Sequence, residues 1–447
     1  MNLDGKQIAV LGAGGSGYAA AALALAHGAK VSVFDSGRPE KLAPAVAKFA
    51  ALGAPLVCGA AALVAPHRFD LTVTSPGIDA SWPIAKAFAA ASDELVGEIE
   101  FAWRLGDTPV IAITGTNGKT TTTALVAAML QGAGLRAVAA GNIGLPYSEV
   151  VRSGEDYDWI VLELSSFQLE TVSTFSPRVA VWLNFAPDHM DRYARVEDYY
   201  AAKLRIFENL ASDGLAVRQL ECEVGPTGRV TPFSAFSDGG DLGYASGEIV
   251  HPATGRAFSF GWCELQGKHN AENVMAALAV ADELGLAWDS VAPAIAAFQA
   301  PPHRCEKVAE IDGVLYLNDS KSTNLHSLES ALAGQDEPVV LIAGGKNKGL
   351  DFAELRELAG RTVREAVCIG EIAGDIAAAW DGAVPCHFAV GVDEAVEMAR
   401  AIARPGEIVL FSPGTSSFDM FTGYEARGEA FRQAVLARVS RDRFLIA

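Results

Sequence analysis

The clearest structural signal in the chain is the segment Val110-Ile-Ala-Ile-Thr-Gly115-Thr-Asn-Gly118-Lys119-Thr120-Thr-Thr-Thr-Ala-Leu-Val126. Its apolar start predicts a strand, and a helical pattern follows the glycine-containing turn. Such a turn lets backbone N–H groups surround phosphate oxygens, while the helix N-terminus and Lys119 add positive charge. Thr120 would place a hydroxyl on a phosphate-bound Mg²⁺. The full phosphate-loop pattern has a glycine where Ile113 stands, so a plain strand-to-helix turn is the alternative.

Length and composition limit the class of protein. At about 150 residues per domain, 447 residues predict three domains. A formal charge of −19 disfavours a broad nucleic-acid or anionic-membrane surface, which needs a basic footprint. Six cysteines without C-x-x-C spacing suit neither a disulfide framework nor a zinc site. With no secretory signal and no long apolar run, we expect a soluble cytoplasmic protein without nucleic-acid or membrane partners.

The N-terminal region carries a nucleotide-binding pattern. A strand at Ile8 to Leu11 precedes Gly12-Ala-Gly14-Gly15-Ser16-Gly17 and an Ala-rich helix, and a second strand ends at Asp35. This fingerprint places a pyrophosphate at the helix N-terminus and an acid near the ribose, as in NAD or FAD sites. A UDP-linked ligand fits the same geometry equally well. A third strand ends in Ser75-Pro76-Gly77, and the mostly helical stretch Ala80 to Ala102 leads to a boundary near residue 97.

After residue 110 strands and helices alternate, which predicts a mostly parallel sheet covered on both faces. The strand from Trp159 to Leu162 ends at Glu163, where a second Mg²⁺ ligand would lie. His189 follows the next strand in the same sheet, and Lys203 lies on the helix after it. The alternatives are a strand-capping glutamate, a structural histidine and a solvated lysine.

The last third of the chain alternates in the same way. Strands are expected at Val314 to Leu317, Val339 to Ala343, Ala366 to Ile369 and Ile408 to Phe411. Polar and cationic residues follow the strand ends, which favours an anion pocket over solvated loops. Before this region, Asn270 and Asn273 share one face of an Ala-rich helix. The prolines at 301 and 302 then predict a linker.

Together these pieces resemble the Mur ligases of peptidoglycan synthesis. The resemblance runs in order over nearly the whole chain and rests on Gly115-Thr-Asn-Gly-Lys-Thr120, Gly141-Asn142-Ile-Gly144, Glu163-Leu-Ser-Ser166, Asp188-His189-Met-Asp191, Ala202-Lys203-Leu-Arg205, His269-Asn270, His303-Arg304, Asn318-Asp319-Ser-Lys321 and the Ser412-Pro413 tail. It implies a three-domain α/β fold: an N-terminal UDP-substrate-binding Rossmann-like domain at 1–97, a central P-loop ATPase-type domain with a mostly parallel sheet at 98–300, and a C-terminal Rossmann-like amino-acid-binding domain at 301–447.

Within the family, the first domain and the ending Ser417-Phe418-Asp419-Met-Phe-x-x-Tyr424-Glu425-x-Arg427-Gly428 look like the branch that adds D-glutamate to UDP-N-acetylmuramoyl-L-alanine. The resemblance implies an ATP-dependent amide ligase that works through an acyl phosphate and acts as a monomer. It also implies two Mg²⁺ ions and a carbamylated lysine.

The site residues carried over by matching position fall into five groups. Catalytic roles go to Lys119, Glu163, His189 and Lys203. Metal contacts go to Thr120, Glu163, His189 and Lys203, the last as a carbamate. ATP contacts go to Gly115, Thr116, Asn117, Gly118, Lys119, Thr120, Thr121, Asn142, Asn270, Asn273, Arg304 and Asp319. UDP-substrate contacts go to Gly15, Ser16, Asp35, Ser36, Ser75, Gly77, Asn142 and His189, and glutamate contacts go to Lys321, Thr323, Lys348, Ser417, Phe418 and Tyr424.

Three other functions remain open at this point. One is a related Mur or folylpolyglutamate-type ligase that uses another amino acid, such as L-glutamate. A second is a nucleotide-dependent oxidoreductase, in which the fingerprint from Gly12 to Gly17 would bind NAD or FAD. A third is a non-catalytic nucleotide switch, which would leave Glu163, His189 and Lys203 without a purpose.

Overall fold

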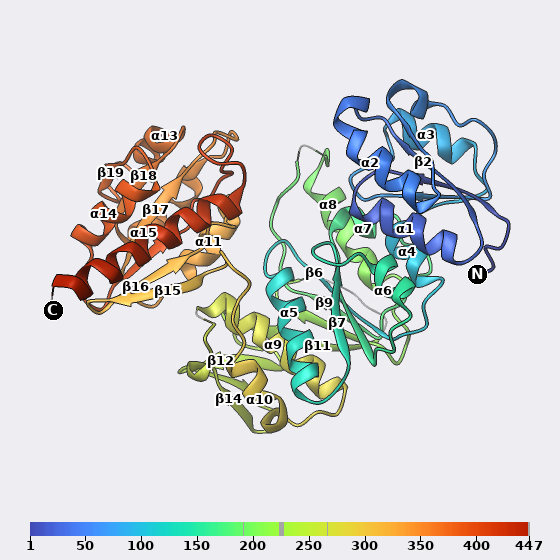
Figure 1. Cartoon of the computed structure of the whole chain (residues 1–447). Coiled ribbons are helices and arrows are strands. Elements are labelled where there is room, and N and C mark those ends of the chain that lie inside the picture. The colour runs from blue at the N-terminus through green and yellow to red at the C-terminus, as the bar shows by residue number, and fades with distance from the viewer. Residues whose placement is uncertain (191, 223–227, 266, 446–447) are drawn as a thin grey trace. The chain divides into compact units, whose positions relative to one another are not determined.

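The structure is a computed structural model that describes residues 1–190, 192–222, 228–265 and 267–445 (Figure 1). The chain forms two compact units. The first contains Met1–Pro232 and Glu283–Gly285, and the second contains Phe233–Asp282 and Leu286–Ala447. Each unit is described by itself below.

The first unit begins with a parallel five-stranded sheet in the order β3-β2-β1-β4-β5. Its strands are β1 (Gln7–Leu11), β2 (Lys30–Asp35), β3 (Leu56–Cys58), β4 (Leu71–Thr74) and β5 (Leu95–Gly97), and its helices are α1 (Gly15–Ala26), α2 (Pro39–Leu52), α3 (Pro83–Ala90) and α4 (Glu98–Trp103). Alternate residues of β1 point to opposite faces, so Ile8 and Val10 join one apolar core and Ala9 and Leu11 another. The expectation that residues 80–102 are mostly helical is wrong at β5, which separates α3 from α4.

The first unit also holds five parallel strands of the central sheet, in the order β7-β8-β6-β9-β10. These are β6 (Val110–Thr114), β7 (Ala137–Gly141), β8 (Trp159–Glu163), β9 (Val179–Trp182) and β10 (Leu215–Gln219), with helices α5 (Lys119–Gly132), α6 (Tyr147–Ser153), α7 (Ser166–Leu169) and α8 (Val196–Leu204). Helix α1 packs against α4 and α6. One apolar core therefore continues from the first sheet into the second, and residues on both sides of position 97 belong to one compact unit.

The second unit contains the end of β11 (Arg229–Ser234), which pairs with β12 (Leu242–Ala245) and leads to β13 (Glu248–His251) and β14 (Arg256–Ser259). Most of α9 (Lys268–Glu283) and all of α10 (Trp288–Ala296) follow. A third sheet then has the order β15-β16-β20-β17-β18-β19, with only β15 antiparallel among its described pairs. Its strands are β15 (Glu306–Ile311), β16 (Val314–Asn318), β17 (Val339–Gly344), β18 (Val363–Ile369), β19 (Cys386–Phe388) and β20 (Ile408–Phe411).

Both faces of this third sheet are covered. Leu341 of β17 packs in a core with α11 (Leu325–Ala333), α12 (Arg356–Thr362) and α13 (Ala373–Ala379). Its neighbour Ile342 packs in a second core with α14 (Val392–Ile402) and α15 (Tyr424–Leu445). A strand buried on both sides explains the unbroken apolar run from Val339 to Ala343.

The predicted α/β class is confirmed, since the three sheets are parallel-rich and helices pack on them. Each sheet lies within one of the ranges 1–97, 98–300 and 301–447, although the boundaries themselves remain predictions. None of the six cysteines, all of them among the described residues, forms a disulfide, and four are buried, as expected for packing residues. In the part of the chain that the structure describes, no helix has the length and apolarity needed to span a membrane.

Candidate functional site

The predicted phosphate loop connects β6 to α5, which begins at Lys119. Gly115 has φ of +156° and Gly118 has φ of +80°, a region that favours glycine. A Cβ at Gly115 would also lie 3.0 Å from the Cβ of Leu183. The Lys119 ammonium donates to the carbonyls of Gly115 and Thr116, each at 2.8 Å. The loop therefore has the tight turn and the cation that phosphate binding requires.

Asn184, which follows β9, holds this loop in place. Its side-chain oxygen accepts the backbone N–H of Asn117 at 2.8 Å, and its amide donates to the Asn117 carbonyl at 3.2 Å. The Asn184 carbonyl also accepts the Thr116 N–H at 3.1 Å. We did not assign Asn184 a role from the sequence, because a single asparagine after a strand carries no spacing signal.

Glu163 ends β8 beside the loop and is 2% exposed. In the ladder between β6 and β8 it pairs with Ile113, two residues before Gly115. Asn142 donates its side-chain amide to a Glu163 carboxylate oxygen at 2.9 Å. The structure thus brings together two of the predicted site residues that lie 21 positions apart in the sequence.

Lys203 lies on α8 and is 1% exposed, so the solvated-face interpretation is wrong. Its ammonium donates to the Gly115 carbonyl at 2.8 Å and lies 4.7 Å from the centre of the Tyr199 ring. Burial, and next the charge of Lys119, hold the pKa of Lys203 well below its usual value, although Asp188 and Glu163 oppose this shift. A lysine in such surroundings has a larger share of neutral amine than a solvated one.

His189 lies in the loop after β9 with φ of +57°, an uncommon backbone conformation for a residue other than glycine. Its backbone N–H donates to the Asp188 carboxylate at 2.8 Å, and its ring centre is 4.9 Å from that of Phe167. Asp191 of the same motif lies outside the described residues. Strained residues concentrate at functional sites, and the conformation is consistent with a role for this histidine.

The N-terminal fingerprint folds as a nucleotide-binding turn. A Cβ at Gly17 would lie 1.9 Å from the Gly12 carbonyl, so α1 approaches β1 too closely for any larger residue. The Asp35 carboxylate accepts backbone N–H groups of Ala13 and Gly37, each at 2.8 Å. The Ser75 hydroxyl is buried without a hydrogen-bond partner in the described structure, which leaves it available to a ligand. The other predicted UDP-substrate residues of this region lie around the same turn, namely Gly15 and Ser16 in the first turn of α1, Ser36 after β2, and Gly77.

In the second unit, Asp319 follows β16 and is buried. It accepts the Ser412 hydroxyl at 2.8 Å and the Cys305 N–H at 3.2 Å. Burial raises the pKa of Asp319 to about 7, although these hydrogen bonds and Arg304 act in the opposite direction. Asn270 and Asn273 are buried on one face of α9, and their side chains are hydrogen-bonded at 2.9 Å.

Arg427 is a buried residue of this unit to which we assigned no role from the sequence. Its guanidinium donates to the Ser320 hydroxyl and carbonyl at 3.0 and 2.7 Å and to the Thr415 carbonyl at 3.0 Å. It therefore ties the loop after β16 to the loop after β20. Its only sequence signal was its place in the C-terminal motif.

The predicted glutamate contacts also lie in the second unit. The Lys321 ammonium is 4.0 Å from the centre of the Tyr424 ring, and the Lys348 ammonium is 3.4 Å from the Thr323 carbonyl. Ser417 is 2% exposed, whereas the adjacent Phe418 is 66% exposed. Lys321 thus lies close to Tyr424, and Lys348 lies close to Thr323.

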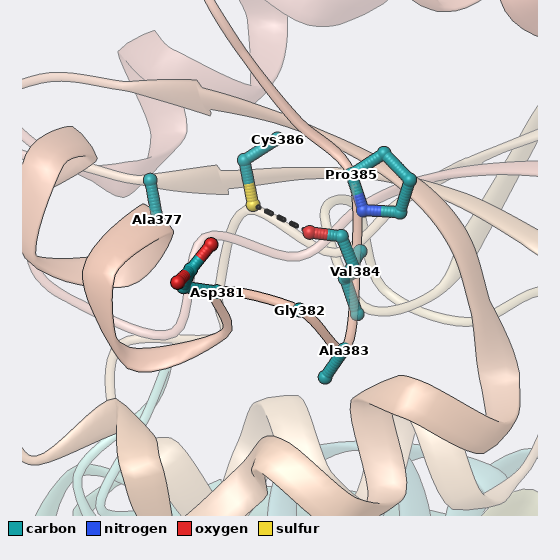
Figure 2. A pocket seen from close by; sticks show the side chains of 7 residues that line it. All are labelled: Ala377, Asp381, Gly382, Ala383, Val384, Pro385 and Cys386. Atoms are coloured by element: carbon teal, nitrogen blue, oxygen red, sulfur yellow. Dashed lines mark hydrogen bonds between the residues drawn. The ribbon is translucent and has the colours of Figure 1, made fainter.

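A hollow of about 510 Å³ lies elsewhere in the second unit, before β19 (Figure 2). It is lined by Ala377, Asp381, Gly382, Ala383, Val384, Pro385 and Cys386. The Cys386 thiol donates to the Val384 carbonyl at 3.4 Å. No predicted site residue lines this hollow, and it lies at the amino end of its strand rather than at the carboxyl edge where ligands of such sheets bind.

Two family models match the chain. The Mur ligase middle domain matches residues 113–281, and the Mur ligase glutamate ligase domain matches residues 303–414. The chain belongs to the Mur ligase family, and the resemblance stated from its sequence motifs is confirmed.

Two curated relatives that carry the same enzyme name match nearly the whole chain. The UDP-N-acetylmuramoylalanine--D-glutamate ligase of Pelotomaculum thermopropionicum is 40% identical over 450 residues, covering 97% of this chain and 98% of its own. The enzyme of the same name from Syntrophotalea carbinolica is 43% identical over 452 residues, with the same coverage.

Solved structures share the fold. MurF from Acinetobacter baumannii has a TM-score of 0.62 at 18% identity, covering 90% of each chain. The ligase MurC from Thermotoga maritima has a TM-score of 0.58 at 20% identity, covering 97% of this chain and 100% of its own. MurF from Thermotoga maritima, solved in complex with ADP, has a TM-score of 0.60 at 15% identity, covering 98% of this chain and 96% of its own.

Proposed function

We propose that this chain is an ATP-dependent ligase that joins D-glutamate to UDP-N-acetylmuramoyl-L-alanine in peptidoglycan precursor synthesis. Relatives with that name are 40% and 43% identical over nearly the whole chain. One structural observation supports it most directly. The ammonium groups of Lys119 and Lys203 both donate to the carbonyl of Gly115, in a loop whose backbone conformation favours glycine. The proposal makes the protein a cytoplasmic monomer without nucleic-acid or membrane partners.

The chemistry required is activation of a poor electrophile. A carboxylate oxygen of the UDP-linked substrate attacks the γ-phosphorus of ATP, the bond to ADP breaks, and an acyl phosphate forms. The amine of D-glutamate then attacks the acyl carbon, loses a proton, and expels inorganic phosphate. Lys119 stabilises the negative charge that grows on the phosphoryl oxygens. His189 is proposed to orient the reactants or to assist the proton transfer.

The residues beside the loop suit magnesium. Glu163 and Thr120 offer carboxylate and hydroxyl oxygens, the hard ligands that Mg²⁺ prefers. Among the described residues no cluster of three or more His, Cys, Asp or Glu side chains forms a metal site. Mg²⁺ at phosphate sites takes most of its ligands from phosphates, water and one or two protein oxygens. Bound Mg²⁺ would neutralise phosphate charge, and the proposal includes two such ions, with His189 as a further ligand.

A carbamate on Lys203 completes the proposed metal site. The neutral amine adds CO₂ and releases a proton, so a cation becomes an oxygen-bearing anion. The lowered pKa of Lys203 supports this step, because only the neutral amine reacts.

The remaining assignments extend the proposal to substrate binding. In the first unit, the loop and Asn142 are proposed to bind ATP phosphates, and the turn around Ser75 is proposed to bind the UDP moiety. In the second unit, Asn270, Asn273, Arg304 and Asp319 are proposed to bind ATP, and Lys321, Thr323, Lys348, Ser417, Phe418 and Tyr424 are proposed to bind glutamate. We also propose the domain boundaries at residues 97 and 300.

The test is an amino-acid screen. The purified chain is incubated with ATP, Mg²⁺ and UDP-N-acetylmuramoyl-L-alanine, and phosphate release is measured with each amino acid in turn. We expect release with D-glutamate, and L-glutamate is the matched control for stereochemistry. Release with another amino acid and not with D-glutamate would identify a different ligase of the family. Tighter binding of NADH than of UDP would instead favour the oxidoreductase.

A further inference from the structure

Arg192 contacts two separate segments of the first unit, the turn after β4 and helix α7 with its C-cap residue. It donates to a Glu170 carboxylate oxygen at 2.5 Å and to the Pro76 carbonyl at 3.3 Å. Its Nε is 3.6 Å from an Asp79 carboxylate oxygen. Its guanidinium carbon is 4.1 Å from the centre of the Phe167 ring, and only 13% of the side chain is exposed. The first sheet and the central sheet are thus connected through one cation.

The same residue belongs to the loop that carries His189. The backbone N–H groups of Arg192 and Tyr193 donate to the His189 carbonyl at 2.9 and 3.1 Å. Tyr193 also donates its hydroxyl to Glu170. Because His189 has a positive φ, its conformation depends on surrounding contacts, and this segment supplies two of them.

The turn that Arg192 contacts and the loop to which it belongs both carry residues assigned to the UDP-linked substrate. Ser75 and Gly77 flank Pro76 in the turn after β4, and His189 lies in the loop after β9. The side chains that bind the Arg192 guanidinium are acidic: Asp79 lies in the turn after β4, and Glu170 ends helix α7. Without a cation between them, these two carboxylates would repel the diphosphate of the substrate.

We propose that Arg192 is a positioning residue for the UDP-linked substrate, which holds the turn Ser75 to Gly77 and the loop of His189 in register and neutralises the acids beside them. This inference rests on the proposed function. It assigns Arg192 no contact with ATP or with the reacting atoms.

The experiment compares Arg192→Gln, Arg192→Lys and the control Arg195→Gln. Arg195 lies three residues further along, is 69% exposed and forms a local ion pair with Asp198. We expect Arg192→Gln to raise the KM for UDP-N-acetylmuramoyl-L-alanine at least tenfold while the KM for ATP stays within twofold. Arg192→Lys should recover part of the loss, because it restores the charge without the planar fork. Arg195→Gln should match the unmodified chain.

A second variant separates positioning from stability. Asp79→Asn removes the negative charge that faces Arg192 on the side of the first sheet and leaves the Pro76 and Glu170 contacts in place, so the substrate KM should rise less than in Arg192→Gln and the melting temperature should change little. Equal rises in the KM for ATP and for the UDP-linked substrate, or an unchanged substrate KM in both variants, would overturn the inference.

The proposed function and the inference can fail separately. If the unmodified chain releases no phosphate with D-glutamate, the proposed function fails. Titration calorimetry with UDP-N-acetylmuramoyl-L-alanine alone, without ATP, tests the inference independently of turnover. Weaker binding by Arg192→Gln than by Arg195→Gln supports it, and equal binding overturns it.

Discussion

Lys119 and Lys203 donate to the same oxygen, the carbonyl of Gly115, each at 2.8 Å. Two cations on one acceptor repel each other, and Lys203 is the buried one of the pair. The two lysines therefore differ in their surroundings: burial and the charge of Lys119 lower the pKa of Lys203.

Replacement of Lys119 by alanine should remove turnover while leaving UDP-substrate binding intact. In the unmodified chain the Lys119 ammonium stabilises charge that develops in the transition state. Without it, kcat should fall by about 10²–10³. Phosphate release measures the first effect and titration calorimetry the second. Lys48→Ala, which changes an exposed lysine, is the control. A Lys119→Ala chain that retains most of its turnover would contradict the assignment.

Replacement of Lys203 by alanine should abolish turnover, and short carboxylic acids should restore part of it. The added carboxylate would take the place of the carbamate beside the metal. Activity is measured across a series of formate and acetate concentrations at constant ionic strength. Absence of rescue at every concentration would argue against a carbamate.

Asn184→Ala should weaken ATP binding without affecting UDP-substrate binding. The variant loses both side-chain hydrogen bonds to Asn117 and so loosens the phosphate loop. A loss of about 1–3 kcal/mol corresponds to a KM for ATP raised roughly 5- to 150-fold. Parallel KM measurements for the two substrates test this. An equal change in both would indicate a general loss of structure.

Asp319→Asn should change the pH dependence of stability. The folded-state pKa of about 7 lies above the ordinary 3.8, so the folded chain binds more protons between these values. Stability contributed by this group is complete below pH 3.8 and is lost as the pH rises towards 7. The asparagine variant should therefore gain stability relative to the original chain on going from pH 5 to pH 8. Denaturant unfolding at the two pH values measures the difference, and an unchanged difference would contradict the shift.

Gly17→Ala should destabilise the first unit by about 2–4 kcal/mol, because its Cβ would lie 1.9 Å from the Gly12 carbonyl. Gly14→Ala is the matched control, since nothing lies within 4 Å of a Cβ there and its backbone is extended. Thermal unfolding of the two variants should separate them by several degrees. Similar melting temperatures would show that α1 can shift at little cost.

The sequence predicted the elements whose patterns are local. β6, its loop and α5 carry an apolar run, two glycines and a lysine at fixed spacing, and the structure has them as expected. β3 and β5 were missed because three residues give no periodicity, and β7 because its Ala-Val-Ala-Ala-Gly sequence has one strand-forming residue, Val138, among alanines and a glycine.

For the site residues, contacts between positions far apart in the sequence could not be predicted. The burial of Lys203 and its bond to Gly115 join positions 88 residues apart, and no local pattern reports such a contact. Asn184, Arg192 and Arg427 act in the same way: each is a single polar residue whose partners come from other loops. The sequence can identify these residues only when they belong to a known motif. Their contacts, which indicate their roles, are visible only in the structure.

The third sheet has a consequence for how the family diverges. Because the residues of β17 are buried and alternate between two apolar cores, an insertion or a polar replacement inside the strand would be costly, and the loops beyond its ends tolerate change better. Those loops are where the amino-acid substrate is proposed to bind. The fold persists in solved structures that are only 15–20% identical to this chain.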